Sequence, residues 1–131
     1  NEVTAITVRY DRTDLAVDET VQATASVDYR APEAANMLLV DLGVPPGFSV
    51  LRGDWDALVE TRAINRYEIE RGRIRVYLAN VAPGSVIELP YRLQARVPLI
   101  ALTPASRAYD YYTPERQGVQ PPERITVHIR G

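Results

Sequence analysis

The sequence contains neither cysteine nor lysine among its 131 residues. Without cysteine there can be no disulfide, no thiolate metal site and no cysteine nucleophile. The absence of lysine also excludes Schiff-base chemistry and a lysine general base. All 15 basic residues are therefore arginine, and together with 17 acidic residues they give a net charge of −2. Because the two signs are interspersed, no basic field is available to hold a phosphate backbone, and nucleic acid is not an expected partner.

Long apolar runs are missing as well. No segment approaches the roughly 20 apolar residues that a membrane-spanning helix needs, and no charged start followed by an apolar stretch resembles a signal peptide. The chain begins at Asn1 and not at methionine, so we interpret it as part of a longer protein. Its length is typical of one domain with its own core, and we predict a single domain over residues 1–131.

Alternation of apolar and polar residues dominates the remaining pattern. Val21, Ala23, Ala25 and Val27 share one face of a predicted strand, while the residues between them are polar. The longest alternation covers residues 86–97, where Pro90 predicts a sheet edge or a bulge. Strands are predicted over residues 3–10, 19–29, 37–44, 64–70, 73–80, 86–97, 103–112 and 124–130. Residues 113–123 are predicted to be a loop or an extended arm.

One short helix is predicted between Asp54 and Arg62. Trp55, Leu58 and Val59 fall at helical spacing on one side, and Asp54 is a candidate N-cap. A helix of about two or three turns is not stable alone in water, so it must dock its apolar stripe on a sheet. The pattern therefore predicts an all-β fold, an immunoglobulin-like antiparallel β-sandwich with one short inserted α-helix.

The polar residues give little support for catalysis or metal binding. His128 is the single histidine, and we expect it on the surface, since one histidine without cysteine cannot form the usual zinc site. Asp54, Asp56 and Glu60 could suggest an acid/base pair or a calcium site, but calcium needs six or more oxygens, usually from a loop. A solvated helix face explains them better. We expect no enzyme activity, no metal and no cofactor.

Tyrosines and one methionine offer candidates for binding. Tyr109, Tyr111 and Tyr112 are interpreted as core aromatics, with a glycan-binding platform as the alternative; strand alternation would send neighbouring rings to opposite faces. Met37, Leu39 and Tyr77 fall on the outward side of their strands. Such residues suit a buried contact with another domain, although scattered surface apolar residues are also common.

Several segments also resemble a known family. Residues 37–41 (MLLVD), 47–48 (GF), 76–81 (VYLANV) and 108–112 (AYDYY) occur in the order found in the C-terminal receptor-binding domain of the α2-macroglobulin and complement family. The resemblance spans roughly residues 21–113 and suggests a bacterial member. Agreement of several motifs in order is more specific than any one of them.

The resemblance implies a role in a larger thioester protein. In thioester-containing relatives this domain lies against the thioester domain, where a methionine and a tyrosine shield the thioester from water. The matching positions are Met37 and Tyr77, and Leu39 is expected beside them. In vertebrate relatives two lysines of the helix bind a clearance receptor; the matching positions are Arg52 and Asp56, and the reversed charge at Asp56 argues against that receptor here.

The favoured interpretation is thus a non-catalytic C-terminal domain of an α2-macroglobulin-like protease-trapping protein. Its expected partners are the thioester domain and other macroglobulin domains of the same parent chain, with proteases reached through the parent. The resemblance implies an extracytoplasmic location, and no membrane insertion by this segment is expected. The alternative is a generic immunoglobulin-like adhesion or carbohydrate-binding module of a bacterial surface protein.

Overall fold

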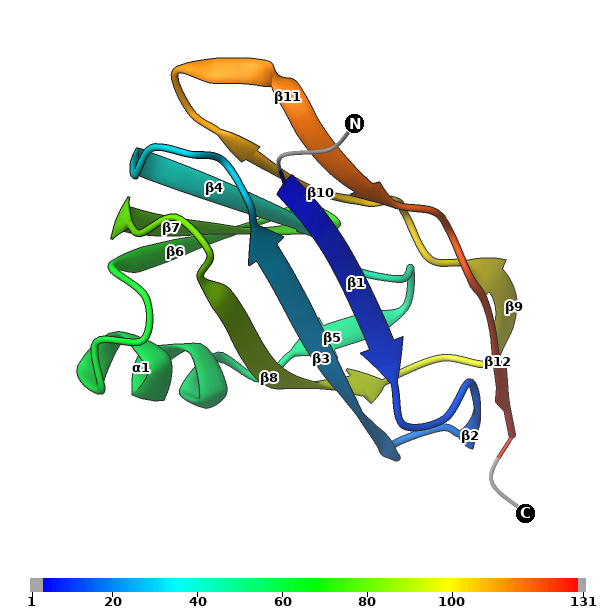
Figure 1. Ribbon diagram of the computed structural model, residues 1–131. Coiled ribbons are helices and arrows are strands. Elements are labelled where there is room, and N and C mark those ends of the chain that lie inside the picture. Colours follow the sequence, from blue (N-terminus) through cyan, green and yellow to red (C-terminus); the bar gives the residue numbers. More distant parts are fainter. Residues whose placement is uncertain (1–3, 130–131) are drawn as a thin grey trace.

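The computed structural model describes residues 4–129, in which two antiparallel sheets face each other across a hydrophobic core (Figure 1). One sheet has the order β1-β3-β8-β5 and consists of β1 (Thr4–Tyr10), β3 (Thr20–Tyr29), β8 (Val86–Ala95) and β5 (Phe48–Val50). The other has the order β11-β10-β4-β7-β6 and consists of β11 (Thr113–Gln120), β10 (Ser106–Asp110), β4 (Ala35–Gly43), β7 (Arg73–Val81) and β6 (Arg66–Glu70). The predicted β-sandwich is confirmed.

A smaller third sheet has the order β2-β12-β9. It consists of β2 (Asp14–Ala16), β12 (Arg124–His128) and β9 (Leu99–Leu102). The pair β12 and β2 is parallel, while β12 and β9 are antiparallel. The first and last predicted strands also included Val3 and Arg130, which lie outside the described residues.

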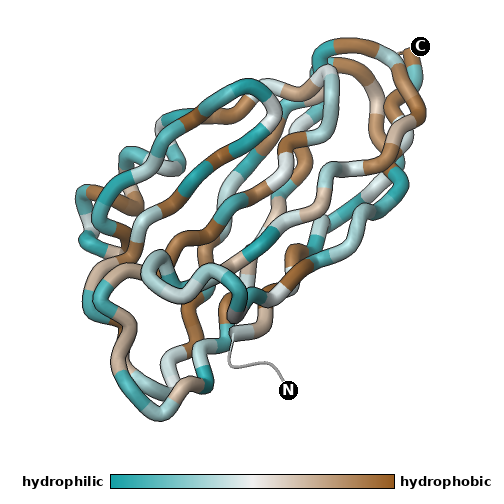
Figure 2. The backbone as a smooth tube through the Cα atoms, turned by 90° about the horizontal axis from the view of Figure 1, so that it is seen from above, coloured by the Kyte–Doolittle hydropathy of each residue, from teal (hydrophilic) through white to brown (hydrophobic). Residues whose placement is uncertain are grey.

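The core follows the alternation read from the sequence. Val21, Ala23, Ala25 and Val27 of β3 are all fully buried, and β8 opposes them with Leu89, Tyr91 and Leu93. Apolar and polar residues alternate along the strands in Figure 2, as expected where each strand has one buried and one outer face. Burial of each such valine or leucine contributes about 1.5–3 kcal/mol to the hydrophobic free energy of folding.

The helix α1 (Arg52–Glu60) closes one side of the sandwich, beside β6 and β8 (Figure 1). As predicted, Trp55 docks on the core: it is fully buried, with its ring centroid 5.0 Å from that of Tyr91 and 6.1 Å from that of Tyr67. The predicted N-cap is wrong, because the helix begins two residues before Asp54 and Leu51 occupies the N-cap position. The Asp54 carboxylate turns to Arg92 of β8 instead.

Pro90 lies in the half of β8 that has a partner strand on one side only, where it pairs with Thr24 of β3. On the side away from β3, the described residues of β5 pair only with Leu93, Gln94 and Ala95. Two positions after Pro90, the backbone N–H of Arg92 donates to Asp54 Oδ2 at 2.9 Å. The edge prediction is therefore confirmed for this half of the strand.

Residues 113–123 contain a strand that the sequence pattern did not predict. β11 pairs antiparallel with β10, with a register irregularity after Tyr109. Its sequence carries Pro114 and shows no apolar alternation, because it is an edge strand whose side chains, so far as they are described, are mostly exposed. The short strands β2, β5 and β9 were missed for a similar reason, since three or four residues are too few to show a period.

Candidate functional site

The predicted contact residues Met37, Leu39 and Tyr77 come together on the outer face of the five-stranded sheet. β4 and β7 are antiparallel neighbours in which Leu39 pairs with Tyr77 and Met37 pairs with Ala79. Met37 and Tyr77 are half-buried, but Leu39 is only 3% exposed. Leu39 was expected at the surface of the contact; within this domain it is already buried, with Tyr77 and Tyr109 as its neighbours on the adjacent strands.

A hollow of about 260 Å³ opens on this face. It is lined by Met37, Arg66, Tyr77, Tyr111 and Tyr112, and we refer to this set as the Met37–Tyr77 hollow. The chain after β10 closes one side of it, because the backbone N–H of Tyr111 donates to the Met37 carbonyl at 2.9 Å. Segments separated by more than 70 residues in the sequence thus form one surface.

The tyrosines of this surface are not core aromatics, which corrects the interpretation of residues 109–112. Tyr111 and Tyr112 are 55% and 70% exposed, and Tyr109 is only half-buried. β10 ends at Asp110, so strand alternation no longer applies to the two residues that follow. The rings of Tyr111 and Tyr112 lie edge to face, with centroids 5.3 Å apart and planes at 88°.

Tyr77 is held by two residues of β6. Its hydroxyl donates to Glu68 Oε1 at 3.0 Å, and the guanidinium carbon of Arg66 lies 3.7 Å from the centre of its ring. Arg66 in turn pairs with Glu68, with Nη1 and Oε2 3.2 Å apart. Burial and the hydrogen bond to Glu68 raise the pKa of Tyr77, while the charges of Arg66 and Arg75 act in the opposite direction. Tyr77 therefore remains a neutral hydrogen-bond donor at neutral pH.

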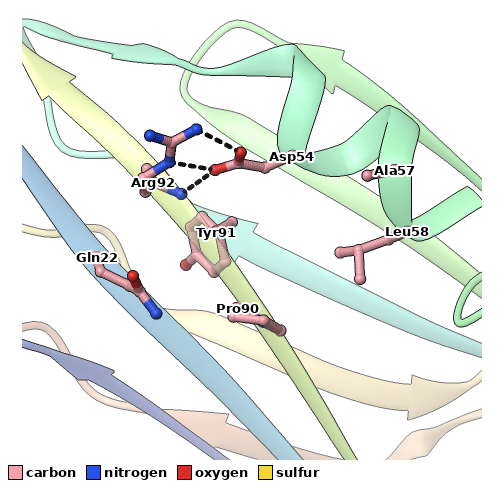
Figure 3. Close-up of a pocket in the computed structure, with 7 residues that line it drawn as sticks. All are labelled: Gln22, Asp54, Ala57, Leu58, Pro90, Tyr91 and Arg92. Atoms are coloured by element: carbon pink, nitrogen blue, oxygen red, sulfur yellow. Dashed lines mark hydrogen bonds and ion pairs between the residues drawn. The ribbon is translucent and has the colours of Figure 1, made fainter.

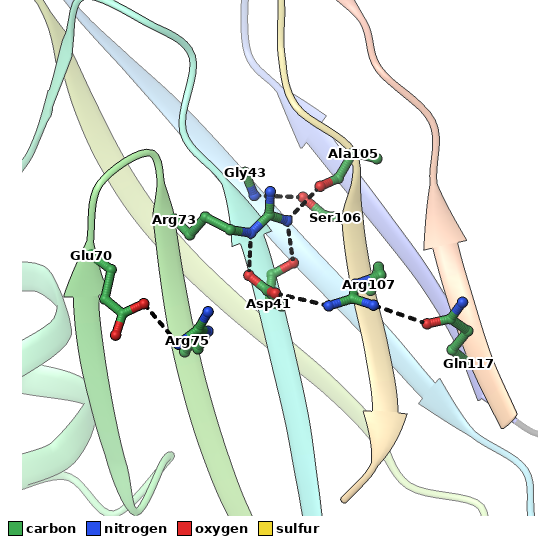
Figure 4. Close-up of polar contacts among 9 residues, drawn as sticks. All are labelled: Asp41, Gly43, Glu70, Arg73, Arg75, Ala105, Ser106, Arg107 and Gln117. Carbon is green, nitrogen blue, oxygen red and sulfur yellow. Dashed lines mark hydrogen bonds and ion pairs between the residues drawn. The ribbon is translucent and has the colours of Figure 1, made fainter. Parts of the chain in front are cut away.

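A buried carboxylate ties together three strands of the same face (Figure 4). Asp41 of β4 is 2% exposed; one of its oxygens accepts from Arg73 Nε of β7, and the other lies 3.3 Å from Arg107 Nη2 of β10. Arg73 also donates to the Ala105 carbonyl at 2.6 Å. The arrangement ties β4 to β7 and to the start of β10 on the same face as the Met37–Tyr77 hollow, four residues along β4 from Met37.

The helix positions Arg52 and Asp56 are both exposed, but they are not free of the domain. Asp56 Oδ1 accepts a hydrogen bond from the Tyr67 hydroxyl, which raises the pKa of Tyr67, and Arg52 interacts with the same hydroxyl. Tyr67 and Arg66 are consecutive on β6, so they point to opposite faces of that strand. The helix positions thus lie apart from the Met37–Tyr77 hollow.

A second hollow, of about 290 Å³, lies between α1 and β8. Figure 3 shows Asp54 and Arg92 paired across it, with Nη2 to Oδ1 at 2.8 Å and Nε to Oδ2 at 3.0 Å. The hydrogen bond from Arg92 is the main reason that the pKa of Asp54 is lowered below its ordinary value. Ala57, Leu58 and Pro90 supply aliphatic walls. These contacts fasten the helix to the edge of β8.

The remaining polar candidates show no site chemistry. His128 is exposed, as predicted, with Nε2 3.1 Å from Asp14 Oδ1. Within the part of the chain that the structure describes, no three histidine, cysteine or acidic side chains gather as a metal site would require. No helix among residues 4–129 is long and apolar enough to cross a membrane.

Sequence reasoning missed Arg66, Glu68 and the contacts of Asp41. Alternation places Asp41 on the same side of its strand as Met37, but it does not identify the arginines that reach it from two other strands. For Arg66, the usable signal was the hairpin turn at residues 71–72, from which the pairing of Arg66 with Tyr77 can be counted.

Comparison with solved structures gives high similarity at low sequence identity. Native α2-macroglobulin from Escherichia coli, spanning the residues from domain MG7 to the C-terminus, matches with a TM-score of 0.81 and 17% identity over 98% of this chain and 24% of that chain. The E. coli protein activated by porcine elastase matches with a TM-score of 0.79 and 17% identity, over 98% of this chain and 13% of that chain. Salmonella α2-macroglobulin reacted with methylamine matches with a TM-score of 0.79 and 16% identity, over 97% of this chain and 9% of that chain. This chain thus spans about a quarter or less of each matched chain.

The family itself is shown by sequence. No curated protein sequence matches the chain significantly. The family model described as the A-macroglobulin receptor binding domain, however, matches residues 33–122, which is more than half of the chain. The resemblance carried by residues 37–41, 47–48, 76–81 and 108–112 is thereby confirmed. The chain belongs to the A-macroglobulin receptor-binding domain family.

Proposed function

We propose that this chain is a non-catalytic C-terminal domain of a bacterial α2-macroglobulin-like, protease-trapping protein, and that it packs on a neighbouring thioester domain. The observation that supports the proposal is the Met37–Tyr77 hollow. The two residues singled out by the family resemblance lie on adjacent strands and line one concave surface.

The composition of the hollow suits a protein interface. Tyrosine, methionine and arginine are the residue types enriched at the buried centres of interfaces, and all three line it. Tyr111 and Tyr112 have more than half of their surface available to a partner. A thioether can adjust to the shape of what packs on it, which makes Met37 a suitable contact. The hollow would therefore accept a side chain or a turn of the docked domain.

Shielding a thioester is a matter of excluding water. A thioester is a reactive acyl donor, and an apolar cover prevents its hydrolysis before the acceptor arrives. The thioester would belong to another part of the parent, because this chain has no cysteine. In this proposal Met37 and Tyr77 supply the cover and take no part in the chemistry. Partners are then the thioester and other macroglobulin domains of the parent, in an extracytoplasmic compartment.

The alternative of a carbohydrate-binding module finds less support. A sugar ring stacks on a flat aromatic surface, whereas the rings of Tyr111 and Tyr112 meet at 88° and share no plane. A glycan array with this chain tests the point directly. Clear binding that is lost in Tyr112→Ala would favour the carbohydrate module and count against the docking proposal.

The proposal is tested by loss of the thioester in the parent protein. Tyr77→Ala and Met37→Ala should each speed spontaneous hydrolysis, measured as free thiol released over time, because each opens a path for water. Ile100→Ala is the matched control, since Ile100 is 68% exposed on β9 of the small third sheet. Hydrolysis rates of Tyr77→Ala and Met37→Ala equal to that of Ile100→Ala would overturn the shielding role.

A further inference from the structure

We propose that Arg66 and Glu68 are positioning residues that fix the Tyr77 ring in the orientation in which it contacts the partner domain. The inference rests on the proposed function and adds to it two residues that the family resemblance does not mark. They hold Tyr77 by separate contacts, one to the ring and one to the hydroxyl.

The first contact follows from strand pairing. Arg66 of β6 lies directly opposite Tyr77 of β7 in the antiparallel register. Side chains at such a pair point to the same face and are close enough to stack. The guanidinium carbon of Arg66 lies 3.7 Å from the ring centre, the arrangement in which a cation is attracted to the face of an aromatic ring. This contact fixes the tilt of the ring relative to the sheet.

The second contact fixes the end of the side chain. Glu68 is two residues along the same strand, so it shares a face with Arg66 and is diagonal to Tyr77. Its Oε1 accepts from the Tyr77 hydroxyl at 3.0 Å, and its Oε2 lies 3.2 Å from Arg66 Nη1. Each of the three side chains therefore contacts the other two. A ring held at both its face and its hydroxyl has little freedom to rotate away from the hollow.

The location of the cluster indicates that it orients Tyr77 towards the partner domain more than it stabilises the fold. β6 is an edge strand of its sheet, and the Arg66 and Glu68 side chains are 58% and 43% exposed. Exposed ion pairs contribute little to folding. Arg66 and Tyr77 also line the Met37–Tyr77 hollow together. An ordered cluster at the rim of a binding hollow lowers the entropy cost of docking, because fewer side-chain rotamers remain to be fixed.

The positioning is measured first in this chain, by NMR titration of the Tyr77 phenol. Glu68, Arg66 and Arg75 are the charged groups that act on the hydroxyl. Glu68→Gln should lower the pKa of Tyr77, because it removes the negative charge that favours the neutral phenol. Arg66→Ala should raise the pKa, since the nearby positive charge is lost. Opposite shifts support the cluster, and an unchanged Tyr77 pKa in both variants would overturn it.

The functional step is measured in the parent protein as the rate of thioester loss. Arg66→Ala and Glu68→Ala should each increase the rate, by a smaller factor than Tyr77→Ala. The matched control is Arg30→Ala. Arg30 pairs with Asp28, two residues away in the sequence as Glu68 is from Arg66, and the two side chains are 56% and 37% exposed. Asp28 lies on β3 of the other sheet, and Arg30 follows the end of that strand.

The possible outcomes separate the two proposals. If Tyr77→Ala speeds hydrolysis while Arg66→Ala and Glu68→Ala behave as Arg30→Ala does, the positioning role is wrong and the shielding role stands. If Tyr77→Ala itself has no effect, the shielding role fails, and the positioning role with respect to the partner domain fails with it, whatever the titration shows. Arg66→Lys refines a positive result: lysine keeps the charge but lacks the planar group that stacks on the ring, so it should restore shielding only in part.

Discussion

The two outer faces of this sandwich have different constructions. On the sheet β1-β3-β8-β5, outward positions carry polar residues that are partly or largely exposed, among them Thr24, Ser26 and Glu88. On the five-stranded sheet, the outward positions Leu39 and Asp41 are 3% and 2% exposed. A residue can be buried on an outer face only if other side chains lie across it.

That covering layer indicates how the second face is used. Tyr77, Tyr109, Arg73 and Arg107 are long side chains on the strands that flank β4. They form a layer of aromatic rings and guanidinium groups on this face, whereas Thr24 and Ser26 on the first face stay partly exposed. The comparison indicates that the second face suits a partner domain. Its side chains are already ordered by contacts with one another and with the buried Asp41, so few of them remain to be fixed when a partner docks. Variants that disturb one face and spare the other test this conclusion.

The largest effect is expected from Asp41→Ala. The substitution leaves Arg73 and Arg107 without their shared acceptor beneath the surface, and it should cost about 2–3 kcal/mol of folding free energy, less than a fully buried pair because both arginines still reach water. Urea denaturation measures the loss. Asp28→Ala is the comparison, because Asp28 lies in an exposed pair with Arg30. Equal losses in the two variants would remove the distinction between the faces.

A smaller effect with a defined pH dependence is expected from Asp54→Asn. The variant should lose about 0.5–1 kcal/mol at neutral pH, since Arg92 is half exposed and the ion pair is partly screened. The pKa of Asp54 is lower in the folded state than its ordinary value of 3.8. The stabilisation is therefore fully present above that value and is lost as the pH falls through the lowered pKa.

Acid denaturation of the two proteins measures this contribution. Below about pH 4 the unfolding free energy of the unsubstituted chain should fall more steeply with decreasing pH than that of Asp54→Asn. Parallel curves over that range would show that the ion pair to Arg92 does not stabilise the folded state.

The smallest effect is expected from Ser26→Ala on the polar face. The hydroxyl donates to Glu88 Oε2 at 2.9 Å, but the contact is exposed and water can replace it. The free energy of unfolding should fall by no more than about 0.5 kcal/mol. Thermal denaturation of the two proteins measures the difference. A loss as large as that of Asp41→Ala would show that the polar face also contains a structural anchor.

Local patterns predicted the strands that have one buried face. β3 and β8 are long, and the alternation of buried with outer residues, as at Val21 and Ala23 in β3 and at Leu89 and Tyr91 in β8, follows directly from the pleat. β11 escaped prediction because an edge strand with exposed side chains has no such pattern. Tyr111 and Tyr112 were misplaced for a different reason: β10 ends at Asp110, so its alternation does not extend to them.

The candidate site was predictable only in part. The alternation of side chains along a strand placed Met37, Leu39 and Tyr77 on the outward side of their strands. The register of β4 and β7 brings these three residues together, as that argument requires. Alternation alone could not show that Leu39 is buried, because its burial depends on side chains from strands that are distant in the sequence. Asp54 illustrates the same limit: its capping propensity is local, whereas its observed partner, Arg92, is 38 residues away.

The exposed half of β8 is protected against pairing with a strand of another chain. An intruding strand would need backbone donors along that edge to pair with it. Pro90 has none to offer, and the N–H of Arg92 is already engaged by Asp54. A second copy of the chain, or a segment of an unfolded neighbour, therefore finds no continuous ladder to extend at this edge.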